Sequence, residues 1–565
     1  MAGVLLVFGY QATVARSALN DAADGAALLQ SQVVAGDVSG ARETLADLQG
    51  STDRARGVTS GVLWRLGSST PWVGDDIQAV RTVSREMDRV VDQAVPPIVD
   101  LAGELNAKTF NPADGTFDIG SIVAVAPATA RAAATLGESD AALSKIDSSS
   151  LIAPLRAPVS TVQAQVDVAA SAAHNASLAA RLLPQMLGVD GTRRYALLVQ
   201  NNAESRADGG IVGSYSVIEA KRGRVKIIDQ GNASDVFPTG RVPKMSKDEK
   251  RVFPSTMVSD LRDTTATPDF PRAAALASRL ISKGRDIPID GAFTVDPVAM
   301  GYLMDGIGSV KIRGDIVLDA SNTASALLHQ VYMLLDDPRA QDEFFRIVTR
   351  RIFNRFTAGD GDAQATLKAL VRGVEENRIS LWSARDAEQE VIASTDLSGS
   401  LPKDNGTTPN VGMYVSDAAS GKMEYFLKTT PTIASVRCPR GDLQQITLVS
   451  DLQSTAPTTG LTKWVTGTGE YVAKGSMRLN IRLMAPYKGY FTSITLDGEP
   501  VTISADRLYG RAVSRLEVVL RPGERKTLKA DVISGPGQVA PPVFNTTPGV
   551  DSLRNGFSAS SSCSA

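Results

Sequence analysis

The chain has 565 residues, of which 43% are hydrophobic and 21% are charged, and its formal net charge at pH 7 is −2. These proportions are ordinary for globular protein, and a chain of this length has room for roughly three or four domains. The near-neutral balance argues against nucleic-acid binding, and no basic stretch is interleaved with aromatic residues.

Only two cysteines and two histidines occur in the sequence. Cys438 and Cys563 do not form a CxxC pair, so a cysteine-based metal site is not expected. His174 and His329 lie in Ala- and Leu-rich stretches that are typical of helices, which argues against a histidine-dependent triad or metal centre. Any catalysis would therefore depend on carboxylates, arginines or a bound cation.

The N-terminal segment, residues 1–15, starts with an apolar run from Ala2 to Tyr10. A membrane-spanning helix needs about 20 apolar residues, and no basic residues precede the run as they would in a secretory signal. We interpret the segment as part of a membrane anchor, with the start of a short buried helix as the alternative. This predicts a single N-terminal anchor in the cell membrane and a body outside the cytoplasm.

Residues 16–186 have the pattern of helices and predict a helical stalk or bundle. Apolar residues recur there at three- and four-residue spacing, as in a seam that packs on another helix. They are Ile77, Val80, Val83, Met87, Val90 and Ala94. Pro96 and Pro97 interrupt this pattern.

From residue 187 to residue 392, predicted strands alternate with predicted helices. The strands are expected at 195–199, 211–218, 224–231 and 291–296, with a helix at 271–284 and further helices up to about residue 376. Such alternation predicts a layered α/β domain. Between the first two strands, residues 200–210 read QNNAESRADGG, which predicts a polar turn whose two glycines supply unusual backbone angles.

Residues 405–535 alternate apolar and polar positions with period two and are rich in β-branched residues. This pattern predicts an antiparallel β-sandwich. Residues 536–565 lack an apolar pattern and predict a disordered tail. The fold class expected from the whole sequence is therefore multidomain, with helical, α/β and β-sandwich parts in that order.

Four segments of the sequence resemble a bacterial family, the domain of unknown function 4012. They read QNNAESRADGGIVGSYS, GRVKIID, IDGAFTVDPVAMGYLMDGIGSVKI and LWSARDAEQ. The resemblance runs from the helical region to the β domain. Members of that family look like membrane-anchored envelope proteins of Gram-positive bacteria that are often linked with exopolysaccharide genes, so the resemblance implies a similar setting here.

The order of the α/β segments is also distantly similar to the LytR-CpsA-Psr phosphotransferases, which move a glycan from a polyprenyl-pyrophosphate carrier onto the cell wall. In that family a strand leads to a Gly-x-Asp-x-Arg turn and then to an Arg-Ser-Asp strand start. Residues 202–208 combine the two elements, with Glu204 in place of the first aspartate, followed by Arg206 and Asp208.

Two later segments carry the same resemblance. Residues 292–310, with Asp296, are similar to the family's valine–aspartate strand and the turn after it, and Arg339, Arg346 and Arg350 stand where the family has a helix with arginines. At 100° per residue these three arginines fall within about 40° of one another on a helix. Arginine offers a two-pronged donor that suits phosphate oxygens, so Arg206 and these three are the predicted pyrophosphate ligands. The alternative is a solvated helix face with ion pairs, such as Asp342 with Arg346.

Glu204 and Asp208 are the predicted catalytic and metal-binding residues. Mg²⁺ prefers one or two carboxylates together with substrate phosphates, and a carboxylate could instead take the proton of an acceptor hydroxyl as general base. The alternative for Glu204 is an ion pair with Arg206 or a bond to a neighbouring amide.

The sequence therefore predicts a membrane-anchored extracytoplasmic protein of cell-envelope or exopolysaccharide assembly. It would bind a polyprenyl-pyrophosphate-linked glycan or wall polymer, with Mg²⁺ as the expected cofactor. Glycopolymer phosphotransfer is the candidate activity, and a non-catalytic structural or scaffold protein of the envelope is the alternative.

Overall fold

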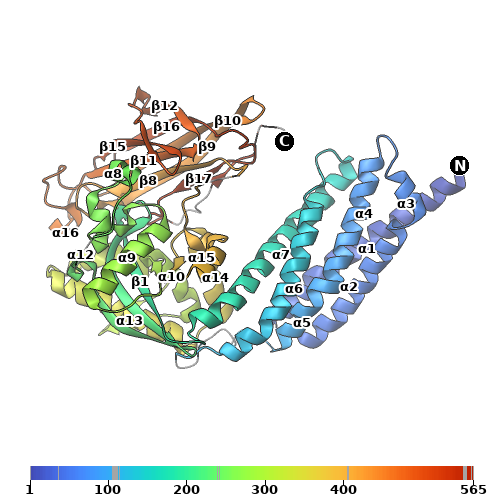
Figure 1. The fold of residues 1–565 in the computed structure, drawn as a ribbon, viewed down its shortest axis with the longest axis horizontal. Coiled ribbons are helices and arrows are strands. Elements are labelled where there is room, and N and C mark those ends of the chain that lie inside the picture. Colours follow the sequence, from blue (N-terminus) through green and yellow to red (C-terminus); the bar gives the residue numbers. More distant parts are fainter. Residues whose placement is uncertain are drawn as a thin grey trace. The chain divides into compact units, whose positions relative to one another are not determined.

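The structure, a computed structural model, describes residues 2–35, 37–104, 112, 115–237, 240, 242–403, 406–551, 557–561 and 563. The chain forms two compact units (Figure 1). One consists of Met1–Pro112 with Phe117–Asp190, and the other of Ala113–Thr116 with Gly191–Ala565.

The first unit is helical, as the sequence predicts. Its helices are α1 (Ala2–Ala35), α2 (Val38–Thr59), α3 (Val62–Gly67), α4 (Gly74–Arg89), α5 (Val95–Glu104), α6 (Ile119–Leu143) and α7 (Ala153–Met186). Among the described residues, α6 is the one helix that is long and apolar enough to cross a membrane, and it does not lie at the very N-terminus. Its side chains Ile122, Val125 and Ala132 are buried at helical spacing within the unit, a pattern that the core helix of a soluble bundle also has.

The helix that carries the predicted seam continues past Pro96 and Pro97 instead of ending there. Val83, Val90 and Ala94 are buried, and the five residues Val90–Ala94 form a π-helical turn, η1, that leads directly into α5. Proline cannot donate a backbone hydrogen bond and its ring crowds the preceding turn. The wider π turn, in which Val95 N–H bonds to the Val90 carbonyl, precedes Pro96 and Pro97 without ending the helix.

The second unit contains a central mixed sheet with the strand order β3-β2-β1-β4-β7. Its strands are β1 (Arg193–Arg206), β2 (Gly209–Lys221), β3 (Arg224–Asn232), β4 (Gly291–Val295) and β7 (Ser380–Ser383). β1 pairs in parallel with β4, and the other neighbours are antiparallel. The predicted alternation of strands and helices in this region is confirmed.

Helices cover both faces of this sheet. They and the accessory elements are α8 (Lys247–Val252), α9 (Phe270–Arg285), α10 (Pro297–Ile307), the hairpin β5 (Val310–Arg313) and β6 (Ile316–Leu318), α11 (Thr323–Ser325), the π turn η5 (Ala326–Gln330), α12 (Val331–Leu334), α13 (Pro338–Ala358), α14 (Ala363–Glu375) and α15 (Asp386–Ala393). Successive residues of a strand point to opposite faces. Accordingly Leu198 packs in one core with Phe270 and Leu280 of α9, and Leu197 packs in another with residues of α10, α13 and α14.

The predicted turn at residues 200–210 is largely wrong, because β1 continues through it to Arg206. The register of β1 against β2 shifts between Val199 and Gln200 and again between Asn201 and Ser205, and the turn itself is Ala207–Asp208. Such bulges break the two-residue alternation by which a strand is recognised in a sequence. The polar residues are therefore part of a strand.

The rest of the second unit consists of two β-sheets, in the region where the sequence predicts strands. The strands are β8 (Asn410–Asp417), β9 (Leu427–Arg440), β10 (Leu443–Ser454), β11 (Met477–Tyr487), β12 (Tyr490–Leu496), β13 (Glu499–Pro500), β14 (Asp506–Leu508), β15 (Arg511–Leu520), β16 (Arg525–Ile533), β17 (Val543–Thr546) and β18 (Phe557–Ser558), with the short helix α16 (Lys463–Thr466) between β10 and β11. One sheet has the order β13-β12-β16-β10-β9 and the other β14-β15-β11-β8-β17-β18. Leu448, Ile481 and Val532, from both sheets, share one hydrophobic core.

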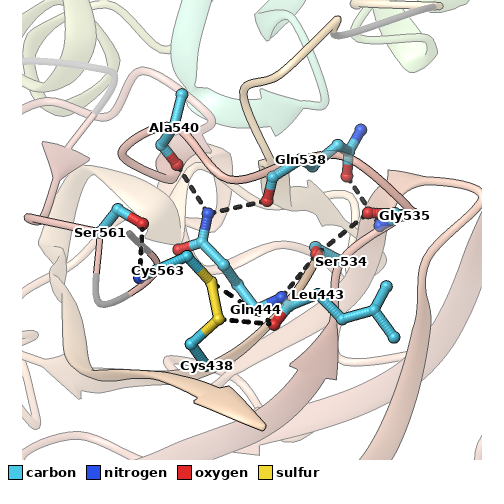
Figure 2. Close-up of a disulfide and its surroundings, with 9 residues drawn as sticks. All are labelled: Cys438, Leu443, Gln444, Ser534, Gly535, Gln538, Ala540, Ser561 and Cys563. Carbon is cyan, nitrogen blue, oxygen red and sulfur yellow. Dashed lines mark hydrogen bonds between the residues drawn. A yellow bond between two sulfur atoms is a disulfide. The ribbon is translucent and has the colours of Figure 1, made fainter. Parts of the chain in front are cut away.

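The prediction of a disordered tail from residue 536 is wrong for the described part of that tail. β17 pairs in parallel with β8, so the second sheet is not purely antiparallel. Cys563 forms a disulfide with Cys438 of β9, 125 residues earlier (Figure 2). The order of this segment comes from backbone pairing and a covalent link, neither of which an apolar pattern records.

A buried glutamine holds the same segment close to the disulfide. Gln444 Nε2 donates to the carbonyl oxygens of Gln538 and Ala540 at 2.8 and 2.7 Å, and Gln444 N donates to Ser534 Oγ at 2.9 Å (Figure 2). The Leu443 carbonyl oxygen lies 3.5 and 3.6 Å from the two sulfur atoms. Since disulfide sulfurs carry no proton, these last two distances are contacts and not hydrogen bonds.

Candidate functional site

The polar half of β1 borders a cavity of about 170 Å³, which we call the β1 pocket. β1 and β2 form one side of it, α13 and α10 another, and Lys422 reaches it from the segment after β8. The lining consists of Val199, Gln200, Asn201, Glu204, Gly213, Ser214, Asn232, Pro297, Met300, Leu327, Tyr332, Gln341, Asp342, Phe345, Val348, Thr349 and Lys422. Residues of β1 and α13 therefore lie on the same cavity.

A small charged network forms the polar side of the β1 pocket. Lys422 Nζ lies 3.0 Å from Glu204 Oε1 and 4.6 Å from the centre of the Tyr332 ring. Asn201 Nδ2 donates to Tyr332 Oη at 2.9 Å and lies 3.3 Å from Glu204 Oε1. Burial and then the negative charge of Glu204 raise the pKa of the Tyr332 hydroxyl well above its usual value, so that it remains a neutral hydrogen-bonding group.

Part of the lining of the β1 pocket is apolar. Val199, Met300, Leu327, Phe345 and Val348 contribute to it, and all of them also pack in the core on this face of the central sheet. On α13, Val348 and Ile352 are buried in this core, and Phe345 and Phe356 are partly buried against it. The pocket can therefore offer hydrogen bonds, a cation and apolar contacts.

Two further carboxyl groups lie close to this network. Burial raises the pKa of Asp417 to about 6, although its oxygens accept bonds from Ala419 N and Ser420 N. Burial also raises the pKa of Glu424 well above its usual value, and the charges of Asp417 and Glu204 act in the same direction. Within the described residues, neither side-chain oxygen of Glu424 has a hydrogen-bond partner. Neither residue was singled out from the sequence, because each lies more than 200 positions after β1.

The four predicted arginine ligands have different surroundings. Arg206 Nε donates to Asp263 Oδ1 at 2.9 Å, and both side chains are mostly buried. On α13, Arg346 forms an ion pair with Glu343 at 2.6 Å, and Arg350 Nε donates to Gln230 Oε1 at 2.9 Å.

None of the four predicted arginines lines the β1 pocket, and Arg339 is exposed. The face of α13 that borders the pocket carries Gln341, Asp342 and Phe345 instead. Asp342 accepts a bond from Asn232 Nδ2 at 2.9 Å, and it does not pair with Arg346 as the alternative interpretation suggested.

The two predicted catalytic carboxylates line different cavities. Glu204 borders the β1 pocket, whereas Asp208, in the turn after β1, borders a larger cleft of about 660 Å³. Asp208 Oδ2 accepts a bond from Gln200 Nε2 at 3.0 Å, and burial raises the pKa of Asp208 well above its usual value. No group of three or more His, Cys, Asp or Glu side chains suited to a metal ion occurs among the described residues. Joint binding of Mg²⁺ by Glu204 and Asp208 remains a prediction.

Asp296, singled out through the resemblance, belongs to a buried ionic cluster. Its Oδ1 accepts a bond from Ala299 N at the start of α10, and its Oδ2 lies 2.7 Å from Arg378 Nη1. Arg378 also pairs with Glu376 at 2.6 Å and donates to the carbonyls of Gly549 and Asp551. This arrangement joins α10 to the C-terminal segment. The Asp296–Pro297 pair before an apolar helix is a sequence signal for the cap of α10. No sequence signal indicated that Arg378 is the ionic partner of Asp296.

Comparison with known proteins gives a family for part of the chain. Residues 190–332 match the family described as protein of unknown function, DUF4012. The match starts just before β1 and ends at Tyr332, so it covers less of the chain than the sequence resemblance suggested. None of the curated proteins compared is significantly similar to the chain.

Among solved structures, the chain is similar to one described as the transcriptional regulator YvhJ from Bacillus subtilis, a LytR-CpsA-Psr family protein. The two are 11% identical, with a TM-score of 0.22 over 36% of this chain and 76% of that chain. A TM-score this low supports no argument about function. The functional argument therefore depends on the residues of the two cavities.

Proposed function

We propose that the protein binds a polyprenyl-pyrophosphate-linked glycan, or a related wall-polymer precursor, at the β1 pocket, as part of cell-envelope or exopolysaccharide assembly. The observation that supports this most is the mixed lining of the pocket, which combines apolar side chains with Lys422 and neutral hydrogen-bonding groups. A polyprenyl phosphate has an apolar chain and an anionic head, and ligand sites of this kind combine apolar walls with a few placed polar groups.

Within the proposal, the ligand's head meets the polar side of the pocket. Lys422 supplies the positive charge, and Gln200, Asn201 and Tyr332 supply neutral hydrogen bonds. Glu204 and Asp342 oppose an anion there, so the ligand must compete with Glu204 for Lys422. The first isoprene units would lie against Met300 and Phe345.

The disulfide supports a location outside the cytoplasm. Disulfides persist in oxidising compartments and are rare where thiols are kept reduced. Cys438 and Cys563 lie 5.2 Å apart at their Cα atoms, although 125 residues separate them in sequence. We therefore propose an extracytoplasmic body, tethered to the membrane by the N-terminal segment, with a helical stalk, a LytR-CpsA-Psr-like α/β domain and a β-sandwich.

We do not extend the proposal to phosphotransfer. General acid–base chemistry needs its groups within hydrogen-bond reach of one reacting site, and Glu204 and Asp208 line different cavities. A purely structural envelope protein is the competing account. It predicts no specific binding of a lipid pyrophosphate.

Substitution of the two partners of one ion pair tests the proposal. Lys422→Met removes the cation and should weaken binding of farnesyl pyrophosphate, measured by calorimetry on the full chain in detergent. Losing a charge-assisted hydrogen bond costs roughly 1.5–3 kcal/mol, which is about ten- to a hundredfold in affinity. Lys428→Met, on β9 and outside the pocket, is the matched control and should bind like wild type.

Glu204→Gln separates the two roles considered for that carboxylate. If Glu204 only competes for Lys422, this variant should bind the pyrophosphate more tightly, with or without Mg²⁺. If Glu204 holds Mg²⁺ on the ligand, the variant should bind more weakly, and only when Mg²⁺ is present. Unchanged binding in Lys422→Met, or no binding by the wild type, contradicts the proposal.

A further inference from the structure

The larger cavity of the second unit lies between the central sheet and the β8–β17 sheet, and we call it the β17 cleft. Its volume is about 660 Å³, within the range of small-molecule sites. The turn after β1, the ends of α14 and α15, the segment 398–402, and the strands β8 and β17 all contribute to its lining. It shares no lining residue with the β1 pocket.

Uncharged hydrogen-bonding groups dominate this lining. It contains six Ser or Thr hydroxyls, three Asn amides and one Tyr, together with three carboxyl groups, and none of its residues is Lys, Arg or His. Hydroxyls and amides both donate and accept hydrogen bonds, as the hydroxyls of a sugar also do. A polyanion would instead meet the carboxyl groups of the lining, and no lining residue is basic.

Several of these groups have hydrogen-bonding capacity that the protein does not use. Tyr414, on β8, makes no side-chain hydrogen bond among the described residues, although its ring is buried in the core beneath the cleft. Asn545 of β17 donates to Asn410 Oδ1 at 2.7 Å, which leaves Asn545 Oδ1 and Asn410 Nδ2 without a bond in the described part of the chain. Burial raises the pKa of Asp208, so its neutral, hydroxyl-like form is favoured.

A guanidinium that bonds to the lining, that of Arg511, is not offered to a ligand. Arg511 is fully buried and donates to the carbonyls of Ala485, Pro402 and Asn410. These bonds hold two lining residues in place and occupy the donors that could otherwise attract an anion. A peptide strand cannot add to β17 either, because β8 and β18 already pair with its two edges.

We infer that the β17 cleft binds an uncharged oligosaccharide segment, at a site separate from the β1 pocket. The inference does not depend on the lipid-pyrophosphate proposal, since neither the residues nor the ligand charge are shared. If the proposal for the β1 pocket and the inference for the β17 cleft are both correct, one chain binds the lipid head of a glycan precursor in the pocket and its sugar part in the cleft.

Saturation-transfer NMR and calorimetry with the full chain test this inference. The probes are a panel of neutral tetrasaccharides of glucose, galactose, mannose and N-acetylglucosamine, with inorganic pyrophosphate as the anionic probe. We expect at least one tetrasaccharide to bind and pyrophosphate not to compete with it. Failure of the whole neutral panel, or displacement by pyrophosphate, overturns the inference.

Tyr414→Phe is the decisive variant. It keeps the buried ring and removes a hydroxyl that has no partner in the described protein, so thermal unfolding should stay unchanged. Loss of one neutral hydrogen bond should weaken tetrasaccharide binding about two- to tenfold. Tyr490→Phe, on β12 of the other sheet, is the matched control. Asn545→Ala should weaken binding in the same way, and equal binding in all three variants would overturn the inference.

Discussion

The ion pair of Lys422 and Glu204 limits how readily the β1 pocket can bind an anion. Their contact of 3.0 Å, together with the cation–π contact of Lys422 to Tyr332, means that a ligand anion has to displace an existing partner. Two buried carboxyls lie near them: the raised pKa of Glu424 favours its neutral form, whereas Asp417, with a pKa of about 6, is mainly ionised at pH 7. The region therefore remains less negative than its sequence suggests, which an anionic ligand requires.

The buried carboxyl of Glu424 should make the free energy of unfolding depend on pH. In the unfolded chain its carboxyl loses its proton near pH 4.5, whereas burial keeps the proton on in the folded chain to higher pH. The folded state therefore binds more protons above pH 4.5, and the free energy of unfolding should fall as pH rises from there. The loss is about 1.4 kcal/mol for each unit by which the pKa is raised.

Glu424→Gln should remove this part of the pH dependence, as measured by urea unfolding between pH 4 and pH 8. Asp417 contributes a loss of the same sign between its unfolded value of 3.8 and about 6, and that loss should remain in the variant. Glu517→Gln is the control. The hydrogen bond from Arg478 lowers the pKa of Glu517, so the small contribution of Glu517 to the free energy of unfolding should rise with pH instead of falling. An unchanged pH profile in Glu424→Gln would show that this carboxyl is solvated in the native state.

At the scale of elements, β1 is the strand that connects the two cavities. Its bulged half borders the β1 pocket, and the turn that follows borders the β17 cleft. The bulge depends on a close backbone approach, since a Cβ on Gly210 would lie 2.3 Å from the backbone carbonyl carbon and oxygen of Asn201. A side chain cannot fit there without moving one of the two strands.

Gly210→Ala should therefore destabilise the protein by roughly 1–3 kcal/mol, the usual cost of overpacking. Gly213→Ala, on the same strand, is the matched control. Its Cβ would meet only the Val199 carbonyl oxygen at 3.8 Å, an ordinary contact, so the substitution should be neutral or stabilising. Chemical denaturation of both variants checks this, and equal stabilities would mean that β1 and β2 do not approach each other so closely.

Apolar runs and periodicity predicted most elements of the central sheet and its helices, because β1 is buried on both faces and the helices on one. Periodicity failed at residues 200–206, where two bulges break the alternation, and at 543–546, where a strand of only four residues is held by backbone pairing with β8. Arg339, Arg346 and Arg350 lie on a helix, as expected, and their spacing places them on one face of it. The spacing could not show that another face of that helix borders the pocket, because helix rotation is set by tertiary packing.

At the scale of the whole molecule, the C-terminal segment joins the parts of the second unit. Asn202 Nδ2 of β1 donates to the Pro548 carbonyl, Arg378 binds the carbonyls of Gly549 and Asp551, and Cys563 is bonded to β9. Residues that are far apart in sequence thus hold the central sheet against the β8–β17 sheet. The β17 cleft lies between these two sheets.

The disulfide should contribute to the stability of this unit mainly by restricting the unfolded chain. Bridges that close long loops typically stabilise by about 2–4 kcal/mol, so Cys563→Ser should lower the free energy of unfolding by that amount. Urea unfolding of the variant and of the wild type, each with and without reductant, checks the prediction. The variant should not respond to reductant, and a wild type that also does not respond would contradict the bridge.

The central claim is that the β1 pocket holds a lipid pyrophosphate. The most direct measurement is photo-crosslinking of the full chain with a polyprenyl pyrophosphate carrying a photoreactive group on its first isoprene unit, followed by mass spectrometry of the labelled residue. The account predicts labelling of α10 and α13 at Met300 or Phe345, competed by unlabelled ligand and reduced in Lys422→Met. Labelling confined to other segments, or labelling that unlabelled ligand does not compete, would contradict it.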